Sequence, residues 1–256
     1  MSGSKARFTD RGKRHFIDAC EAADMHKIAS FLHEGMDVNF ILESQESHRQ
    51  SPLHAAAYAG RRVVCEQLLA KGWDTNLLNK VGEAPLACAA RGGYLETVDL
   101  LLRRGARVGA KDTEGRTALW VAAHVGASED VCRMLLDAGA DCNDSAPEGD
   151  YTVLMAAVIG DGGALVDLLV ARGADLRAKT KDGESVLALA VEEAVSSGNN
   201  AAVLALVAQG APAGRSDLVA RCGDNMELAD AIRSLVMRER LSRLLPRPAM
   251  WRLGAR

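Results

Sequence analysis

The side chains that could support catalysis or metal binding are dispersed through this 256-residue sequence and form none of the common reactive motifs. A nucleotide-binding Gly-Lys-Ser/Thr loop, a zinc-binding H-E-x-x-H helix and a G-x-S-x-G nucleophile turn are all missing from it. The glycine pairs Gly92-Gly93 and Gly162-Gly163 could cradle a phosphate, but both fall between helical segments, where a turn is the simpler explanation. We therefore expect that the protein is not an enzyme and uses no cofactor.

The cysteines argue against a metal centre, because no two of them are spaced as C-x-x-C. Most should be small buried apolar residues, and unpaired cysteines are typical of a reducing compartment. The sequence shows no signal-peptide-like stretch and no apolar run long enough to span a membrane. We expect no metal and an intracellular, cytoplasmic protein, with the nucleus as an alternative. The six cysteines are Cys20, Cys65, Cys88, Cys132, Cys142 and Cys222.

Two further candidates for acid–base chemistry have simpler structural explanations. His54 follows Ser51-Pro-Leu at the start of a predicted helix, where its ring can hydrogen-bond to neighbouring turns more readily than act as a general base. Glu192 and Glu193 are adjacent on another predicted helix, and we expect them to face solvent or a partner.

The stretch from Ser51 to Gly72 predicts a pair of short helices. Ser51 suits an N-cap and Pro52 the first helical turn, while Gly60 separates the two helices and Gly72 ends the second. The same unit starts again at 84, 117, 152 and 185, each time with a Leu two residues later. Two short helices cannot bury their apolar faces alone, so the copies must stack against one another.

This pattern resembles the ankyrin repeat, a turn and two helices with a period of about 33 residues. Gly115-Arg-Thr-Ala-Leu-Trp-Val-Ala-Ala and Gly139-Ala-Asp-Cys-Asn are among the clearest matches to the pattern of that family. The resemblance implies an all-α solenoid of stacked helix–turn–helix units with short hairpin-like turns. A core of Ala, Leu and Val agrees with it, because only 4% of the residues are aromatic although 48% are hydrophobic.

The predicted domain organisation is one elongated array. Residues 1–11 should be disordered, and residues 12–236 should form the array, with a C-terminal cap at about 212–236. The repeats should start near residues 12, 45, 79, 112, 146 and 180. Leu228, Ile232, Leu235 and Val236 form an apolar stripe in that cap, and residues 237–256 form a basic helix end and tail.

A binding surface follows from the resemblance. In ankyrin proteins the turn tips and inner helices line a concave face that usually binds the partner, so the residues at these positions are the candidate partner-binding set. They are His48, Gln50, Tyr58, Lys80, Val81, Glu83, Arg91, Thr113, Glu114, Arg116, His124, Tyr151, Ile159, Lys181, Asp182, Glu184 and Glu192.

We expect a non-catalytic adaptor or scaffold that binds another protein through this face and is monomeric by itself. A net charge of −3 gives no reason to expect nucleic acid. Two alternatives are an inhibitor or assembly chaperone that occludes an enzyme or complex surface, and a targeting subunit that uses the basic C-terminal helix.

Two tryptophans replace residues that the family pattern would have. Trp73 follows a closing glycine where Ala is usual, and Trp120 takes the position that His54 holds in the first of these copies. We expect both to fill space at repeat junctions, although an exposed Trp120 would instead be a binding hot spot. Losing the His in four of five copies should remove inter-repeat hydrogen bonds worth about 1 kcal/mol each.

Overall fold

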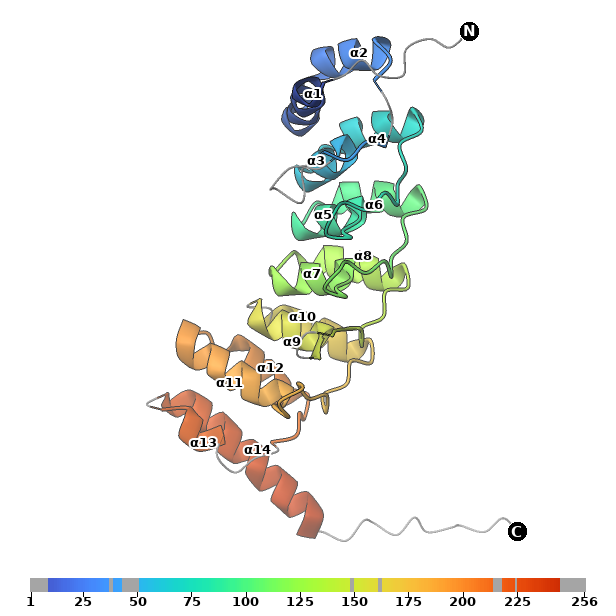
Figure 1. The fold of residues 1–256 in the computed structure, drawn as a ribbon. Coiled ribbons are helices and arrows are strands. Elements are labelled where there is room, and N and C mark those ends of the chain that lie inside the picture. Colours follow the sequence, from blue (N-terminus) through green and yellow to red (C-terminus); the bar gives the residue numbers. More distant parts are fainter. Residues whose placement is uncertain are drawn as a thin grey trace, which may run out of the picture.

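The computed structural model describes residues 9–36, 39–42, 51–147, 150–160, 163–213, 218–223 and 225–244, with side chains up to residue 238. Within these ranges fourteen helices form pairs that stack in chain order, so the expected all-α solenoid is confirmed (Figure 1). Residues 1–8 and 245–256 lie outside them. The expectation of disorder up to residue 11 is wrong at its end, because the first helix begins at Asp10 with Thr9 as its N-cap.

The helices form two rows. Each inner helix contacts the next inner helix, and from the second pair onward each outer helix contacts the next outer helix. The inner row is α1 (Asp10–Ala22), α3 (Pro52–Tyr58), α5 (Pro85–Arg91), α7 (Ala118–His124), α9 (Val153–Ile159), α11 (Val186–Ser197) and α13 (Leu218–Arg221). The outer row is α2 (Met25–His33), α4 (Arg62–Ala70), α6 (Leu95–Arg103), α8 (Glu129–Asp137), α10 (Gly163–Ala171), α12 (Ala201–Ala208) and α14 (Met226–Leu244).

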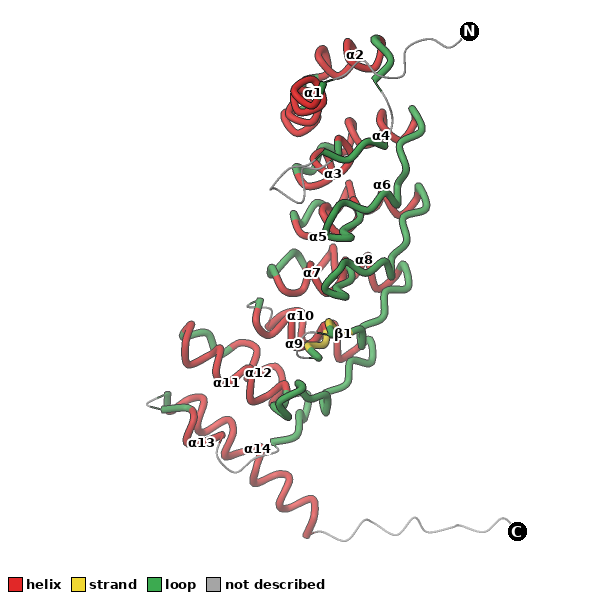
Figure 2. The backbone as a smooth tube through the Cα atoms, in the orientation of Figure 1, coloured by secondary structure: helices red, strands yellow, loops and turns green. Residues whose placement is uncertain are grey.

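From α4 to α11, the described parts of the connections between successive pairs run along the same edge of the stack (Figure 2). In one of them the strands β1 (Ser145–Ala146) and β2 (Tyr151–Thr152) pair antiparallel, with Ala146 opposite Tyr151. No helix in the described ranges is both long and apolar enough to cross a membrane.

The five unit starts found in the sequence, at residues 51, 84, 117, 152 and 185, are N-caps of inner helices. The hydroxyls of Ser51, Thr117, Thr152 and Ser185 each accept a hydrogen bond from the backbone N–H three residues ahead. Ala84 has no hydroxyl to do this, and its helix begins instead with Pro85, whose missing N–H needs no acceptor there.

Small residues let the inner helices approach closely. A Cβ atom added to Gly160 would lie only 2.4 Å from the carbonyl oxygens of Ala123 and His124, so no larger residue fits between the ends of α7 and α9 without a shift. Trp73 is buried with its ring 6.0 Å from that of Phe16, and it fills a repeat junction as expected.

Side chains of one repeat bond to the backbone of the next. The asparagines at the ends of three copies accept hydrogen bonds from backbone N–H groups one repeat later: Asn39 from Asp74 at 2.7 Å, Asn76 from Arg107 at 2.8 Å and Asn143 from Asp175 at 2.9 Å. These bonds fix the offset between neighbouring units. Each joins the fourth residue after one closing glycine to the second residue after the next closing glycine.

His54 makes the same kind of link on the inner side. Its Nε2 lies 2.9 Å from the carbonyl oxygen of Glu83, which can only accept, so Nε2 carries the proton. Its Nδ1 therefore accepts from the Ser51 hydroxyl at 2.6 Å. Acceptance at Nδ1 needs the neutral ring, and burial lowers the pKa of His54 from 6.5 to about 4.

Trp120 replaces this link in a different copy. Its indole N–H donates to the carbonyl oxygen of Tyr151 at 2.8 Å. Tyr151 directly precedes an N-cap, as Glu83 does, so the two acceptors are equivalent. This copy therefore keeps an inter-repeat bond although it has lost the histidine, because the indole provides the donor.

The stack should lose stability in acid through His54. Its folded-state pKa lies below its unfolded value, so its contribution is present above about pH 6.5 and disappears as the pH falls toward 4. Between about pH 7.5 and pH 5 the free energy of unfolding should fall by about 2 kcal/mol from this residue, as measured by urea denaturation.

The matched control is His54→Gln, which keeps polar atoms but cannot titrate. It should be less stable than the wild type at pH 7.5 and should lose about 2 kcal/mol less on acidification. Equal acid sensitivity of the two chains would show that another group is responsible.

Candidate interaction groove

A hollow of about 250 Å³ opens between the copies that begin at Thr117 and Thr152, which are the third and fourth of the five registered copies starting at 51, 84, 117, 152 and 185. Its walls come from the ends of α7 and α9, the turn before α7 and the β-hairpin before α9. The lining residues are Glu114, Arg116, Trp120, His124, Ala146, Tyr151 and Ile159. Five of these belong to the predicted partner-binding set, so the repeat register brings residues from 114 to 159 together at one site.

The position of each wall residue follows from the repeat. His124 and Ile159 are the last residues of α7 and α9, and they face the same side because the two helices stack in register. Ala146 was not predicted, since its place depends on the pairing of β1 with β2. The hairpin was detectable in the sequence only as additional residues before Thr152.

Trp120 forms the floor of the hollow. Only 8% of its surface is exposed, which confirms that Trp120 packs inside the protein and is not an exposed binding hot spot. Its ring stacks on His124 with centroids 5.0 Å apart, and the Arg116 guanidinium lies 5.9 Å from its centre. Such stacking holds Arg116 and His124 at the mouth of the groove.

Arg116 is held in place by two carboxylates. It bonds to Asp112 at 2.8 Å and to Glu114 at 2.6 Å. Asp112 also accepts the backbone N–H groups of Glu114 and Arg116, so one buried carboxylate fixes both the turn and the guanidinium. Asp112 was missed in the predicted set. Its signal was the preference for Asp or Asn at the start of a turn, which Asn79 also shows in the preceding copy.

The pKa of His124 lies below its ordinary value of 6.5. Burial lowers its pKa first, and the charges of Arg116 and then Arg91 lower it further. At neutral pH the ring is therefore uncharged and available as a hydrogen-bond partner.

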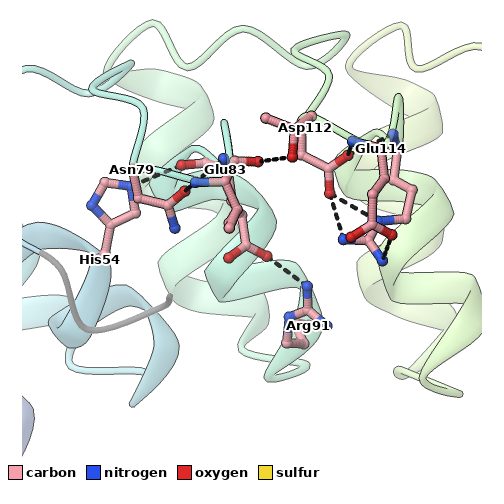
Figure 3. A network of polar contacts seen from close by, with 9 residues as sticks. His54, Asn79, Glu83, Arg91, Asp112 and Glu114 are labelled. Carbon is pink, nitrogen blue, oxygen red and sulfur yellow. Dashed lines mark hydrogen bonds and ion pairs between the residues drawn. The ribbon is translucent and has the colours of Figure 1, made fainter. Parts of the chain in front are cut away.

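Glu83 does not point outward, and this prediction is wrong. Its side chain is only 2% exposed and forms an ion pair of 2.7 Å with Arg91, which is 26% exposed (Figure 3). The reason is local charge compensation, since the residue eight positions later in the same copy is an arginine that can bond to Glu83 from the surface side. Arg91 is thus partly engaged within the protein.

The other predicted positions differ in how available they are. Lys80, Thr113, Lys181 and Asp182 are exposed, and Tyr58 and Val81 are half-buried. Thr113 donates its hydroxyl to the Val81 carbonyl at 3.0 Å, which links two turn tips. His48 and Gln50 lie outside the described residues.

Two acidic residues, Glu184 just before the copy that begins at Ser185 and Glu192 within it, are already paired. Arg221 of α13 bonds to Glu192 at 2.7 Å and to Glu184 at 3.3 Å. Arg221 of α13 therefore offsets part of the negative charge at this end of the concave face. The sequence could not reveal the pairing, because 29 residues separate Arg221 from Glu192 and only the stacking of α13 on α11 joins them.

The thiols show no sign of reactivity. All six cysteines are buried and free, and burial raises the pKa of each one. A raised pKa keeps them protonated at neutral pH, so they are poor nucleophiles and poor metal ligands. Among the described residues no group of three His, Cys, Asp or Glu side chains could hold a metal ion.

A larger hollow, about 620 Å³, lies against α1 and α2 and contains none of the predicted residues. It is lined by His15, Asp18, Asp24 and Lys27, among others. A terminal repeat has a neighbour on one side only, so an open hollow on such a unit is expected from the architecture. The groove between the third and fourth registered copies has no such explanation.

The sequence matches the family model described as Ankyrin repeats (3 copies) over residues 16–112 and again over residues 53–146. Together these matches cover just over half of the chain. The chain belongs to the ankyrin-repeat family. Ankyrin repeats are in general protein–protein interaction modules, which agrees with a groove lined by large side chains instead of a reactive cluster.

Curated relatives with quite different activities share the ankyrin repeats. The chain is 38% identical over 109 residues to the human transient receptor potential cation channel subfamily A member 1, covering 41% of this chain and 10% of the channel. It is 44% identical over 88 residues to the probable E3 ubiquitin-protein ligase XBOS33 of Oryza sativa, covering 34% of this chain and 17% of the ligase. The chain thus spans less than a fifth of the length of these two relatives.

The buried ion pair should be more sensitive to loss of one member than to loss of both. Arg91→Ala leaves the Glu83 carboxylate buried without its counter-charge and should lower the free energy of unfolding by about 3 kcal/mol. The double variant Glu83→Gln, Arg91→Gln removes both charges and should recover most of that loss. Urea denaturation measures both, and a single variant no less stable than the double variant would contradict the pairing.

Proposed function

We propose that this ankyrin-repeat protein is a non-catalytic adaptor or scaffold that binds a protein partner on its concave face, centred on the groove over Trp120. The observation that carries the proposal is the convergence of Arg116, His124, Tyr151 and Ile159 around one hollow. Tyr and Arg are among the residue types that most often dominate the binding energy of protein interfaces.

The groove is suited to binding because it is preorganised. Arg116 is fixed by Asp112, and the stacked rings of Trp120 and His124 lose little conformational freedom when a partner binds. Fewer side chains must be ordered on binding, so more of the contact energy is available for affinity. The Ile159 side chain offers an apolar contact at the opposite wall.

The absence of catalysis and the place of action are part of the same proposal. Protonated, buried thiols and a structural role for His54 support a binding protein over an enzyme. Six free cysteines also support an intracellular, cytoplasmic protein, because a reducing compartment keeps such thiols unpaired. We propose a monomer that binds no nucleic acid, in keeping with a net charge of −3.

Affinity capture from lysate of the native source tests the groove. Ile159→Lys places a charge at the apolar wall and should reduce partner capture at least about tenfold, since burying an unpaired charge costs more than 1.4 kcal/mol. The matched control is Leu204→Lys, which changes an exposed leucine of outer helix α12. Capture that is equally reduced in both variants, or in neither, would contradict the groove as the binding site.

A further inference from the structure

Two ion pairs beside the groove have the same orientation. In each, the carboxylate is buried and the arginine side chain is partly exposed: Glu83 is 2% exposed against 26% for Arg91, and Asp112 is 3% exposed against 23% for Arg116. The protein therefore holds two arginines at this surface with their charges anchored from within. A guanidinium has five N–H donors, so one that is bonded to a carboxylate can still donate to a second acceptor, although Nε of Arg91 is buried.

Both arginines act on His124, although only Arg116 lines the groove. Arg91 is the last residue of α5, as His124 is of α7, so the two lie one repeat apart on the inner face. Arg116 belongs to the same copy as His124, and its guanidinium lies over the Trp120 ring. Burial is the main reason that the pKa of His124 is lowered, and the charges of Arg116 and Arg91 lower it further, so both arginines act on this ring.

We infer that the groove recognises an acidic protein segment in which a carboxylate is adjacent to a large apolar side chain. The apolar side chain would enter the hollow between Trp120, Tyr151 and Ile159, while the carboxylate would bond to the outer edges of Arg116 and Arg91. This inference rests on the proposed function and adds the chemistry of the partner to it.

A basic segment is disfavoured by the same geometry. The face of Trp120 that could attract a cation already has Arg116 at 5.9 Å, so a second cation would have to displace it from Asp112. The carboxylate that could attract a cation is Glu114, which bonds to Arg116 and is 51% exposed. An acidic segment would compete with Glu114 for Arg116, and an exposed carboxylate is readily displaced.

The probe is a random peptide library displayed on phage and selected on the immobilised full chain. Selected peptides should be enriched in Asp or Glu next to Leu, Phe or Trp. The affinity of one such synthetic peptide is then measured by fluorescence anisotropy for the wild type and the variants. Selection of Lys- or Arg-rich peptides would overturn the inference.

Three variants should change the affinity for the peptide in three different ways. Arg116→Gln should weaken binding about tenfold, because a charge-assisted hydrogen bond is worth 1.5 kcal/mol or more. Glu114→Gln removes a competing carboxylate and should tighten binding. Arg133→Gln is the matched control on outer helix α8, where Arg133 also pairs with a glutamate, and it should change nothing. Weaker binding by the Glu114→Gln variant would overturn the inference. Misfolding would not explain it, because the Glu114 side chain is exposed.

The outcomes separate this inference from the proposed function. If selected peptides of another charge bind and lose affinity with Ile159→Lys, the groove is a binding site and only the acidic specificity is wrong. If no selected peptide is sensitive to Ile159→Lys, both the groove and its specificity are contradicted.

Discussion

The structure depends on contacts between neighbouring repeats, since no pair of short helices could bury its apolar face alone. The helices of each row stack on the next, and polar bonds fix the offset at which they do so. His54 reaches the carbonyl of Glu83, and Trp120 reaches the equivalent carbonyl of Tyr151. Because every such bond joins consecutive copies, the relative positions of all surface residues follow from the same repeated geometry.

The groove is a product of that regularity and of one departure from it. Regular stacking places His124 and Ile159 on one face, while the longer connection before α9 adds the hairpin that carries Ala146 and Tyr151. Trp120 has two structural roles here: its N–H links two repeats, and its ring contacts Arg116 and His124. A residue that holds the stack together thus also shapes the surface available to a partner.

Charge is arranged so that the interior anchors what the surface presents. Glu83 and Asp112 are buried, and each holds an arginine at the edge of the concave face. At the far end Arg221 reverses the pattern, because a cation of the C-terminal unit pairs with the acidic side chains of the preceding copy. The middle of the array is therefore the part where anchored cations and an apolar hollow occur together.

The sequence by itself determined the repeat unit, the N-caps at Ser51, Thr117, Thr152 and Ser185, and the positions that line the inner face. These follow from local capping and from a period near 33 residues, both of which act within one unit or between equivalent positions. Only the tertiary structure decided that Glu83 is buried, that Asp112 anchors Arg116, and that Arg221 pairs with Glu192. Each of these depends on which charged side chain lies nearest in space, and side chains of similar sequence pattern can pair inward or face solvent.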